Sequence, residues 1–291
     1  MTSSLTKSSA HLKKRKFVSK LFAVVCGGAT LLAVFALASL LFGVFREGLP
    51  HLSASFLTSP PSRFADKAGI FPALMGSIWV LGITLVVAVP LGVGAAIYLQ
   101  EYASANRVTQ FVQVNIANLA GVPSIVYGIL GLALFVRAMA FERSVLSGGL
   151  TLALLVLPIV IIAAQEALRG VQPSLREGSY ALGATRWQTI SRQVLPVAMP
   201  GILTGVILAL SRAIGETAPL IMMGALTYVA FPPSHLKDGF TALPIQIFNW
   251  TSRPQASFQE IAAAGIIVLL CVLLSMNAFA IALRQRYKKK S

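Results

Sequence analysis

Charged side chains are scarce in this sequence. Only 11% of its 291 residues are Asp, Glu, Lys or Arg, whereas an ordinary soluble domain carries about 25% charged residues. Apolar residues make up 56% of the chain, and the mean hydropathy is +0.78. This composition excludes a water-soluble globular domain and indicates an integral membrane protein.

Cysteine is rarer still, with Cys26 and Cys271 as the two examples, each inside an apolar run. We expect both to be packing residues, not a disulfide or metal ligands. The sequence also lacks the phosphate-binding loop G-x-x-x-x-G-K-[ST]. Any ATP hydrolysis linked to this chain is therefore expected on a partner chain, and the chain itself is expected to be a non-enzyme without a cofactor.

Six apolar stretches are long enough to cross a bilayer, which takes about 20 residues of helix. Lipid offers the backbone no hydrogen-bond partners, and the alternating pattern of a membrane barrel is absent, so we expect an all-α membrane protein. The predicted spans are Leu21–Phe45, Leu74–Leu99, Phe111–Met139, Leu146–Leu168, Ile202–Tyr228 and Ile261–Leu283. The apolar region of the first span is longer than that of a signal peptide, so we interpret it as an uncleaved anchor.

Basic residues predict the orientation, because Lys and Arg collect in cytoplasmic loops. If the N-terminus is cytoplasmic, 16 Lys and Arg lie on that side and 7 on the other. Both termini are therefore expected to be cytoplasmic. The net charge of +15 comes from residues that flank apolar runs, which indicates orientation signals and contact with membrane lipid, and no nucleic-acid partner.

The connection Arg169–Met199 is long for a helix-to-helix loop and amphipathic. Pro173 predicts a helix start, with Glu177 in its first turn, and Gly183 predicts its end. A second short helix is expected over Thr185–Val194, with Trp187, Ile190 and Val194 on one apolar face and with Pro196 and Pro200 ending it before the fifth span. A surface helix lying among lipid headgroups is the alternative.

This connection resembles the cytoplasmic motif EAA-x3-G-x9-I-x-LP of the membrane subunits of ABC-type importers. Glu177, Gly183, Leu195 and Pro196 fall at the motif's spacing, while Gly178, Ser179 and Gln193 depart from it. The resemblance implies six helices of the type I importer kind and a coupling helix between spans four and five that docks on an ATP-hydrolysing subunit.

Charged residues interrupt the fifth span. Arg212 and Glu216 are four positions apart, so on a helix they share one face and can form an ion pair. Both are costly in hydrocarbon, and Pro219 frees the carbonyl of Gly215, so we expect a bent helix that lines a pathway. A guanidinium can bind an oxyanion such as phosphate. The alternative is a structural ion pair that holds the span to its neighbours.

The run Arg212–Leu220 resembles the phosphate-specific branch of the importer family, as do the run from Leu175 and the run Val122–Gly128. The resemblance implies that Arg212, Glu216 and Thr217 line the translocation path. It also implies four kinds of partner: a second homologous permease subunit, two ATP-binding subunits, an extracytoplasmic phosphate-binding protein and membrane lipid.

Two further segments allow two interpretations each. In Val122–Gly128, small residues favour close helix packing over substrate contact. Phe248, Asn249 and Trp250 in an outer loop could contact the binding protein or lie at the membrane interface.

The leading hypothesis is a permease subunit of an ATP-driven phosphate importer in a bacterial inner membrane. A permease for another oxyanion and an ATP-independent secondary transporter are the alternatives. We expect a basic cytoplasmic tail over 1–20, the first span and an outer loop over 21–70, a permease core over 71–284 that contains the coupling loop 169–199, and a second basic tail over 285–291.

Overall fold

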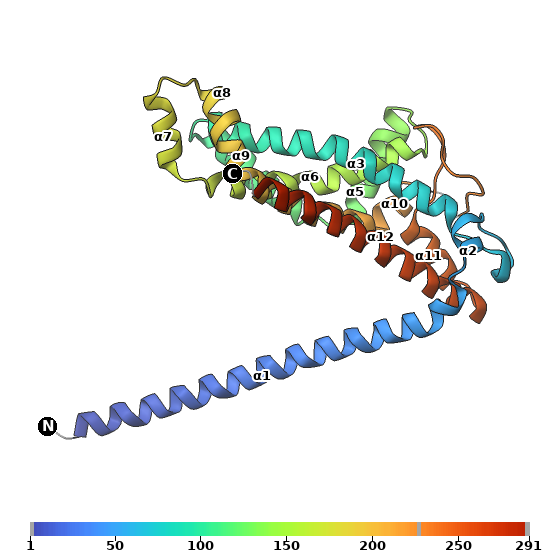
Figure 1. The fold of residues 1–291 in the computed structure, drawn as a ribbon, viewed down its shortest axis with the longest axis horizontal. Coiled ribbons are helices and arrows are strands. Elements are labelled where there is room, and N and C mark those ends of the chain that lie inside the picture. The colour runs from blue at the N-terminus through green and yellow to red at the C-terminus, as the bar shows by residue number, and fades with distance from the viewer. Residues whose placement is uncertain (1–2, 226–227, 289–291) are drawn as a thin grey trace.

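The computed structural model describes residues 3–225 and 228–288. Every secondary-structure element in this part of the chain is a helix (Figure 1). The long helices are α1 (Ser3–Gly48), α3 (Phe71–Ile97), α6 (Val145–Arg169), α9 (Leu195–Gly215) and α12 (Ala256–Lys288). Shorter helices are α2 (Ala54–Thr58), α4 (Arg107–Ala120), α5 (Ser124–Gly131), α7 (Pro173–Ala181), α8 (Arg186–Thr189), α10 (Ala218–Met222) and α11 (Leu243–Thr251). Single turns of 3₁₀-helix lie at Leu49–His51 and Ala65–Lys67, and π-turns lie at Tyr98–Tyr102, Leu132–Ala138 and Ile190–Val194.

Five of these helical stretches are long and apolar enough to cross a membrane, and the bent pair α4–α5 makes a sixth if it is counted as one span. The straight spans are Lys14–His51, Phe71–Tyr102, Val145–Arg169, Arg186–Gly215 and Ala256–Arg286. The predicted all-α membrane fold is confirmed. The segment that contains α7 and α8 lies at one end of the bundle with the C-terminal end of α12, and α2 and α11 lie at the other end (Figure 1).

Helix α6 is the centre of the bundle and packs against α3, α9, α5 and α4. Small residues allow the close approach: a Cβ built on Gly149 of α6 would lie 2.5 Å from the Cβ of Ile83 on α3. Beside it, the hydroxyl of Thr84 donates to the carbonyl of Gly149 at 3.1 Å. Without a hydrophobic driving force between helices in lipid, such packing and hydrogen bonding hold the bundle together.

The third span is broken, not a single helix over Phe111–Met139 as its apolar length suggested. The helical direction bends by 102° between α4 and α5, across the turn that contains Pro123. Proline has no N–H and restricts the residue before it, so a helix is readily interrupted there. The hydroxyl of Tyr127 donates to the carbonyl of Leu119 at 2.8 Å and ties the two halves together.

The start and end of the fifth span differ from the prediction. Helix α9 begins at Leu195 and runs through Pro196 and Pro200, so these prolines do not end the preceding helix. Pro196 follows the π-turn Ile190–Val194, where the regular α-helical hydrogen-bond pattern is already interrupted, and the helical stretch Arg186–Gly215 continues through it. At its other end α9 stops at Gly215, seven residues before the end of α10, so the chain is interrupted where a bend was predicted. The predicted end of the span at Tyr228 follows residues 226 and 227, which lie outside the described part of the chain.

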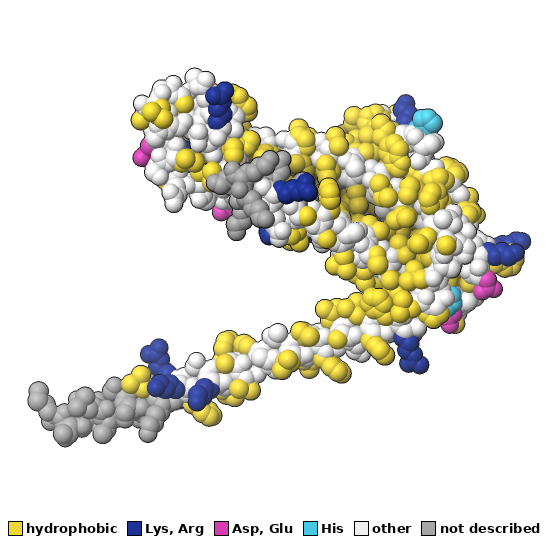
Figure 2. All heavy atoms as spheres, viewed as in Figure 1, with side chains coloured by type: hydrophobic (Ala, Val, Ile, Leu, Met, Phe, Trp, Pro, Cys, Tyr) yellow, Lys and Arg dark blue, Asp and Glu magenta, His cyan; other side chains and the backbone are white. Residues whose placement is uncertain are grey.

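Helix α1 contacts the bundle near its C-terminal end, through α12, and the rest of it extends away from the other helices (Figure 1). Hydrophobic side chains cover this free length, with basic side chains near its N-terminal end (Figure 2). Cys26 on α1 and Cys271 on α12 are both exposed and free. The sequence predicted packing residues and no disulfide. Both thiols are free, but they lie on helix faces that the chain itself leaves uncovered, so neither packs against the rest of this single chain.

Candidate functional site

Arg212 and Glu216 form the predicted ion pair. Nε of Arg212 lies 3.2 Å from Oε1 of Glu216, and their side chains are 50% and 16% exposed. Arg212 is in the last turn of α9 and Glu216 is the residue after the helix, with an extended backbone at φ −76° and ψ 117°. The half-exposed guanidinium thus keeps donors free on its outer side.

The break behind this pair is tightly packed. Thr217 is partly buried and precedes Ala218 and Pro219, which begin α10. A Cβ on Gly128 of α5 would lie 2.7 Å from Cα and from O of Pro219, so the backbones of α5 and α10 touch. The packing interpretation of Val122–Gly128 is supported at Gly128. Helix α5, the second half of the broken third span, therefore packs directly against α10, which follows the break in the fifth span.

A polar contact inside the bundle was missed from the sequence. Ser211 directly precedes Arg212, and its Oγ lies 2.6 Å from Oδ1 of Asn277 on α12. An asparagine within an apolar span is costly unless it is paired, and this rule could have marked Asn277. The contact holds the last turn of α9, which also carries Arg212, against α12.

The second candidate site is the connection between α6 and α9. Pro173 begins α7 and Gly183, at φ +80°, follows its end, as predicted. Thr185 then begins α8 with a capping box that includes Gln188. The hydroxyls of Ser179 and Thr189 lie 2.9 Å apart and join α7 to the second helix. The segment is compact, and its sharp turn relies on a glycine because side chains rarely tolerate a positive φ.

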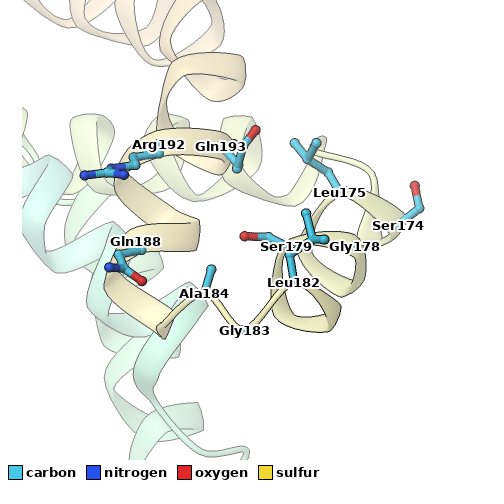
Figure 3. A pocket seen from close by; sticks show the side chains of 10 residues that line it. All are labelled: Ser174, Leu175, Gly178, Ser179, Leu182, Gly183, Ala184, Gln188, Arg192 and Gln193. Atoms are coloured by element: carbon cyan, nitrogen blue, oxygen red, sulfur yellow. The ribbon is translucent and has the colours of Figure 1, made fainter.

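An open groove of about 600 Å³ lies between α7 and the helical segment Arg186–Val194 (Figure 3). Both polar and apolar side chains line its walls, and Gly183 and Ala184 lie in the connection between the two sides. The lining residues are Ser174, Leu175, Gly178, Ser179, Leu182, Gly183, Ala184, Gln188, Arg192 and Gln193. Leu182 is 90% exposed, so this surface presents an apolar side chain that its own chain does not cover.

The four motif residues lie in different surroundings. Glu177 and Gly183 are exposed on this segment, Leu195 packs against the core, and Pro196 is exposed at the start of α9. Glu177 was expected in the first turn of α7, but it is the fifth residue of the helix that begins at Pro173 and therefore lies in the second turn. Any interaction with the helix dipole is weak there.

The predicted apolar face of the second helix is also partly wrong. Ile190 and Val194 are fully buried, but Trp187 is 59% exposed. The π-turn Ile190–Val194 changes the number of residues per turn, so side chains before and after it no longer follow the 3.6-residue spacing.

The sequence did not predict a largely buried ion pair at the start of this segment, in the first turn of α7. Arg176 of α7 donates to Glu101, in the π-turn that follows α3, from Nη2 to Oε1 at 2.7 Å and from Nε to Oε2 at 3.3 Å. The two side chains are 19% and 7% exposed. They are 75 positions apart in the chain, so no local pattern could have revealed the pair.

Residues 88–289 match the protein family described as "Binding-protein-dependent transport system inner membrane component". The chain is 39% identical over 228 residues to the "Phosphate transport system permease protein PstA 1" of Mycobacterium tuberculosis, covering 77% of this chain and 72% of that protein. It is 33% identical over 282 residues to the "Probable ABC transporter permease protein YqgI" of Bacillus subtilis, covering 91% and 95%.

A solved structure shares the fold. An inward-facing structure of the MetNI methionine ABC transporter has a chain that aligns with 75% of this chain and 94% of its own length, at a TM-score of 0.59 and 18% identity. The likeness extends to the fold alone at this identity. It agrees with the type I importer architecture that the cytoplasmic motif implied.

Proposed function

The chain belongs to the binding-protein-dependent transport system inner membrane components, and on that premise we propose that it forms part of the path of an inorganic phosphate importer. Its family makes it a multi-pass, non-catalytic permease subunit of an ABC transporter in a bacterial inner membrane. The substrate and the roles of single residues are our proposal.

The observation that carries the proposal is the half-exposed Arg212 at the break in the fifth span. A guanidinium offers planar donors that match phosphate oxygens. Glu216, paired with it at 3.2 Å, competes with a bound anion and so favours release of the anion into the path. Thr217 adds a hydroxyl at the same level. The names of relatives such as the M. tuberculosis protein support phosphate over other oxyanions.

The groove of the α7–α8 segment is proposed to contact an ATP-binding subunit. Gly183 lines the groove and Glu177 is exposed on α7, while Leu195 and Pro196 begin α9, the helix that carries Arg212 in its last turn. A displacement of this segment by the ATP-binding subunit would therefore be passed along α9 to the proposed anion site. The family assignment favours this arrangement over an ATP-independent carrier.

The remaining partners and the division of the chain follow from the same proposal. A second homologous permease, two ATP-binding subunits and an extracytoplasmic phosphate-binding protein complete the transporter, with both termini cytoplasmic. Residues 1–20 and 285–291 serve as basic tails near lipid headgroups, 21–70 as an anchor with an outer loop, and 71–284 as the core. Residues 1, 2 and 289–291 of these tails lie outside the described part.

Co-purification followed by ATPase measurement tests the proposal. The chain, tagged and expressed with its partner subunits, should retain an ATP-binding subunit. In proteoliposomes, ATP hydrolysis should rise on addition of the phosphate-loaded binding protein. Retention of the ATPase without stimulation by phosphate, but with stimulation by another oxyanion, would assign the path to that oxyanion.

A further inference from the structure

The π-turn Tyr98–Tyr102, which continues α3 at the proposed cytoplasmic end, is contacted by arginines from α6, α7 and α8. At its centre, the carboxylate of Glu101 accepts two hydrogen bonds from Arg176, at 2.7 and 3.3 Å. Such a bidentate pair fixes both the separation and the relative orientation of the two side chains. The ends of α3 and α7 are thereby held in one geometry.

The remaining donors of Arg176 extend this connection to α6. Its Nη1 donates to the carbonyl of Val171 at 2.8 Å, and its Nη2 also donates to the carbonyl of Leu168 at 2.9 Å. Leu168 is in the last turn of α6, where carbonyls lack helical partners. One largely buried guanidinium therefore joins α3, α6 and α7.

Two flanking contacts reinforce the central pair. Nε of Arg169 donates to Oε1 of Gln100 at 3.1 Å, and the guanidinium carbon of Arg186 lies 5.2 Å from the centre of the Tyr102 ring, within cation–π range. Three successive residues of the π-turn are thus each held by an arginine of the connection. Both flanking arginines are exposed, so the buried Glu101–Arg176 pair is the strongest link.

The N-terminal half of α3 lies close to the break in the fifth span. Val80 and Leu81 of α3 line a small internal void together with Ala213 and Ile214 of α9 and Leu220 of α10. Ala213 directly follows Arg212. Helix α3 therefore runs between the Glu101–Arg176 pair and the backbone that carries the proposed anion site.

We infer that Glu101 and Arg176 are positioning residues through which the α7–α8 segment moves α3, and with α3 the break at Glu216. The inference rests on the proposed function, in which this segment contacts an ATPase. A pair that only stabilised α7 would, when weakened, reduce ATPase binding and uptake together. A transmitting pair would, when weakened, leave ATP hydrolysis in place and separate it from uptake.

The test compares Glu101→Gln and Arg176→Lys with wild type in the reconstituted transporter. For both variants we expect the amount of co-purified ATPase and its hydrolysis rate to stay within about twofold of wild type. The phosphate transported per ATP should fall about tenfold, which is the size of effect expected when one charge-assisted hydrogen bond is lost. Glu166→Gln is the matched control, because it removes an ion pair with Arg169 that is 63% exposed on the glutamate side. It should retain the wild-type ratio.

A covalent link gives a second measurement if these variants assemble poorly. In Glu101→Cys/Arg176→Cys, made in a chain in which the exposed Cys26 and Cys271 are replaced by Ala, a short bismaleimide cross-linker should restore phosphate transported per ATP toward the wild-type value. An unchanged ratio in Glu101→Gln, an equal fall in uptake and hydrolysis, or no recovery on cross-linking would overturn the inference alone. A wild-type complex without ATPase or phosphate uptake would contradict the proposed function, and the inference with it.

Discussion

Arg212 and Glu216 remain paired at 3.2 Å although only Arg212 lies in helix α9. The helix stops at Gly215, and the extended backbone at Glu216 turns its carboxylate back onto the last helical turn. The pair therefore stands at an interruption of a span and not on a continuous helical face. An interruption of backbone at membrane depth is tolerated where it is packed against protein or lines a cavity, which supports a role in the path.

Replacing Arg212 should stop transport without preventing assembly. We expect Arg212→Gln to lower phosphate uptake about 10- to 100-fold, since a hydrogen bond to a charged group contributes about 1.5–3 kcal/mol. Arg212→Lys should retain intermediate uptake, because it keeps the charge but loses the planar fork. Uptake by vesicles measures both. The control is Arg284→Gln, which removes an arginine that donates to Thr204 on α9 and should leave uptake close to wild type.

Removing the charge of Glu216 should change binding and release in opposite directions. In Glu216→Gln the guanidinium of Arg212 no longer has an anionic competitor, so we expect tighter phosphate binding and slower release. Initial uptake rates across phosphate concentrations should show a lower KM together with a lower kcat. A higher KM at unchanged kcat would assign Glu216 to substrate binding instead.

The contact of Gly128 with Pro219 should be intolerant of any side chain. A Cβ at Gly128 would lie 2.7 Å from backbone atoms of Pro219, and overpacking of this kind costs about 1–3 kcal/mol. Gly128→Ala should therefore lower the Tm of the purified complex. Gly82→Ala, on α3 with nothing within 4 Å, should not. Equal Tm values for the two variants would show that α5 and α10 separate easily.

The turn at Gly183 should be sensitive in a different way. Its φ of +80° disfavours a residue with a Cβ by roughly 1–2 kcal/mol. We expect Gly183→Ala to loosen the α7–α8 segment and reduce co-purified ATPase severalfold, with normal insertion of the chain. Gly170→Ala, where the added Cβ meets only ordinary contacts at 3.5 Å and beyond, is the control and should retain the ATPase.

Asp238, in the loop between α10 and α11, predicts that the local structure of this loop is lost in acid. The backbone N–H groups of Ser234 and His235 both donate to its Oδ2 at 2.8 Å, and these hydrogen bonds lower the pKa of Asp238 below its ordinary value of 3.8. Since the folded-state pKa is lowered, the stabilisation is present above about pH 4 and is lost as pH falls through the folded-state value. Hydrogen exchange at Ser234 should stay slow from pH 7 down to pH 4, and Asp238→Asn should exchange faster over that whole range.

The sequence predicted those features that depend on local composition. Apolar length located the spans, Pro173 and Gly183 bounded α7, and the four-residue spacing of Arg212 and Glu216 predicted their contact. The misses have physical reasons. A π-turn moved Trp187 off the buried face, and α9 accommodated Pro196 in its first turn. The Glu101–Arg176 pair depends on tertiary packing of distant segments, which periodicity and capping rules do not report.

Uptake of labelled phosphate by proteoliposomes that contain the complete transporter tests the central claim most directly, with sulfate and molybdate as competitors. We predict ATP-dependent phosphate uptake that neither competitor reduces in equimolar amount and that Arg212→Gln lowers about 10- to 100-fold. Uptake that is independent of ATP, or that continues at the wild-type rate in Arg212→Gln, would contradict it.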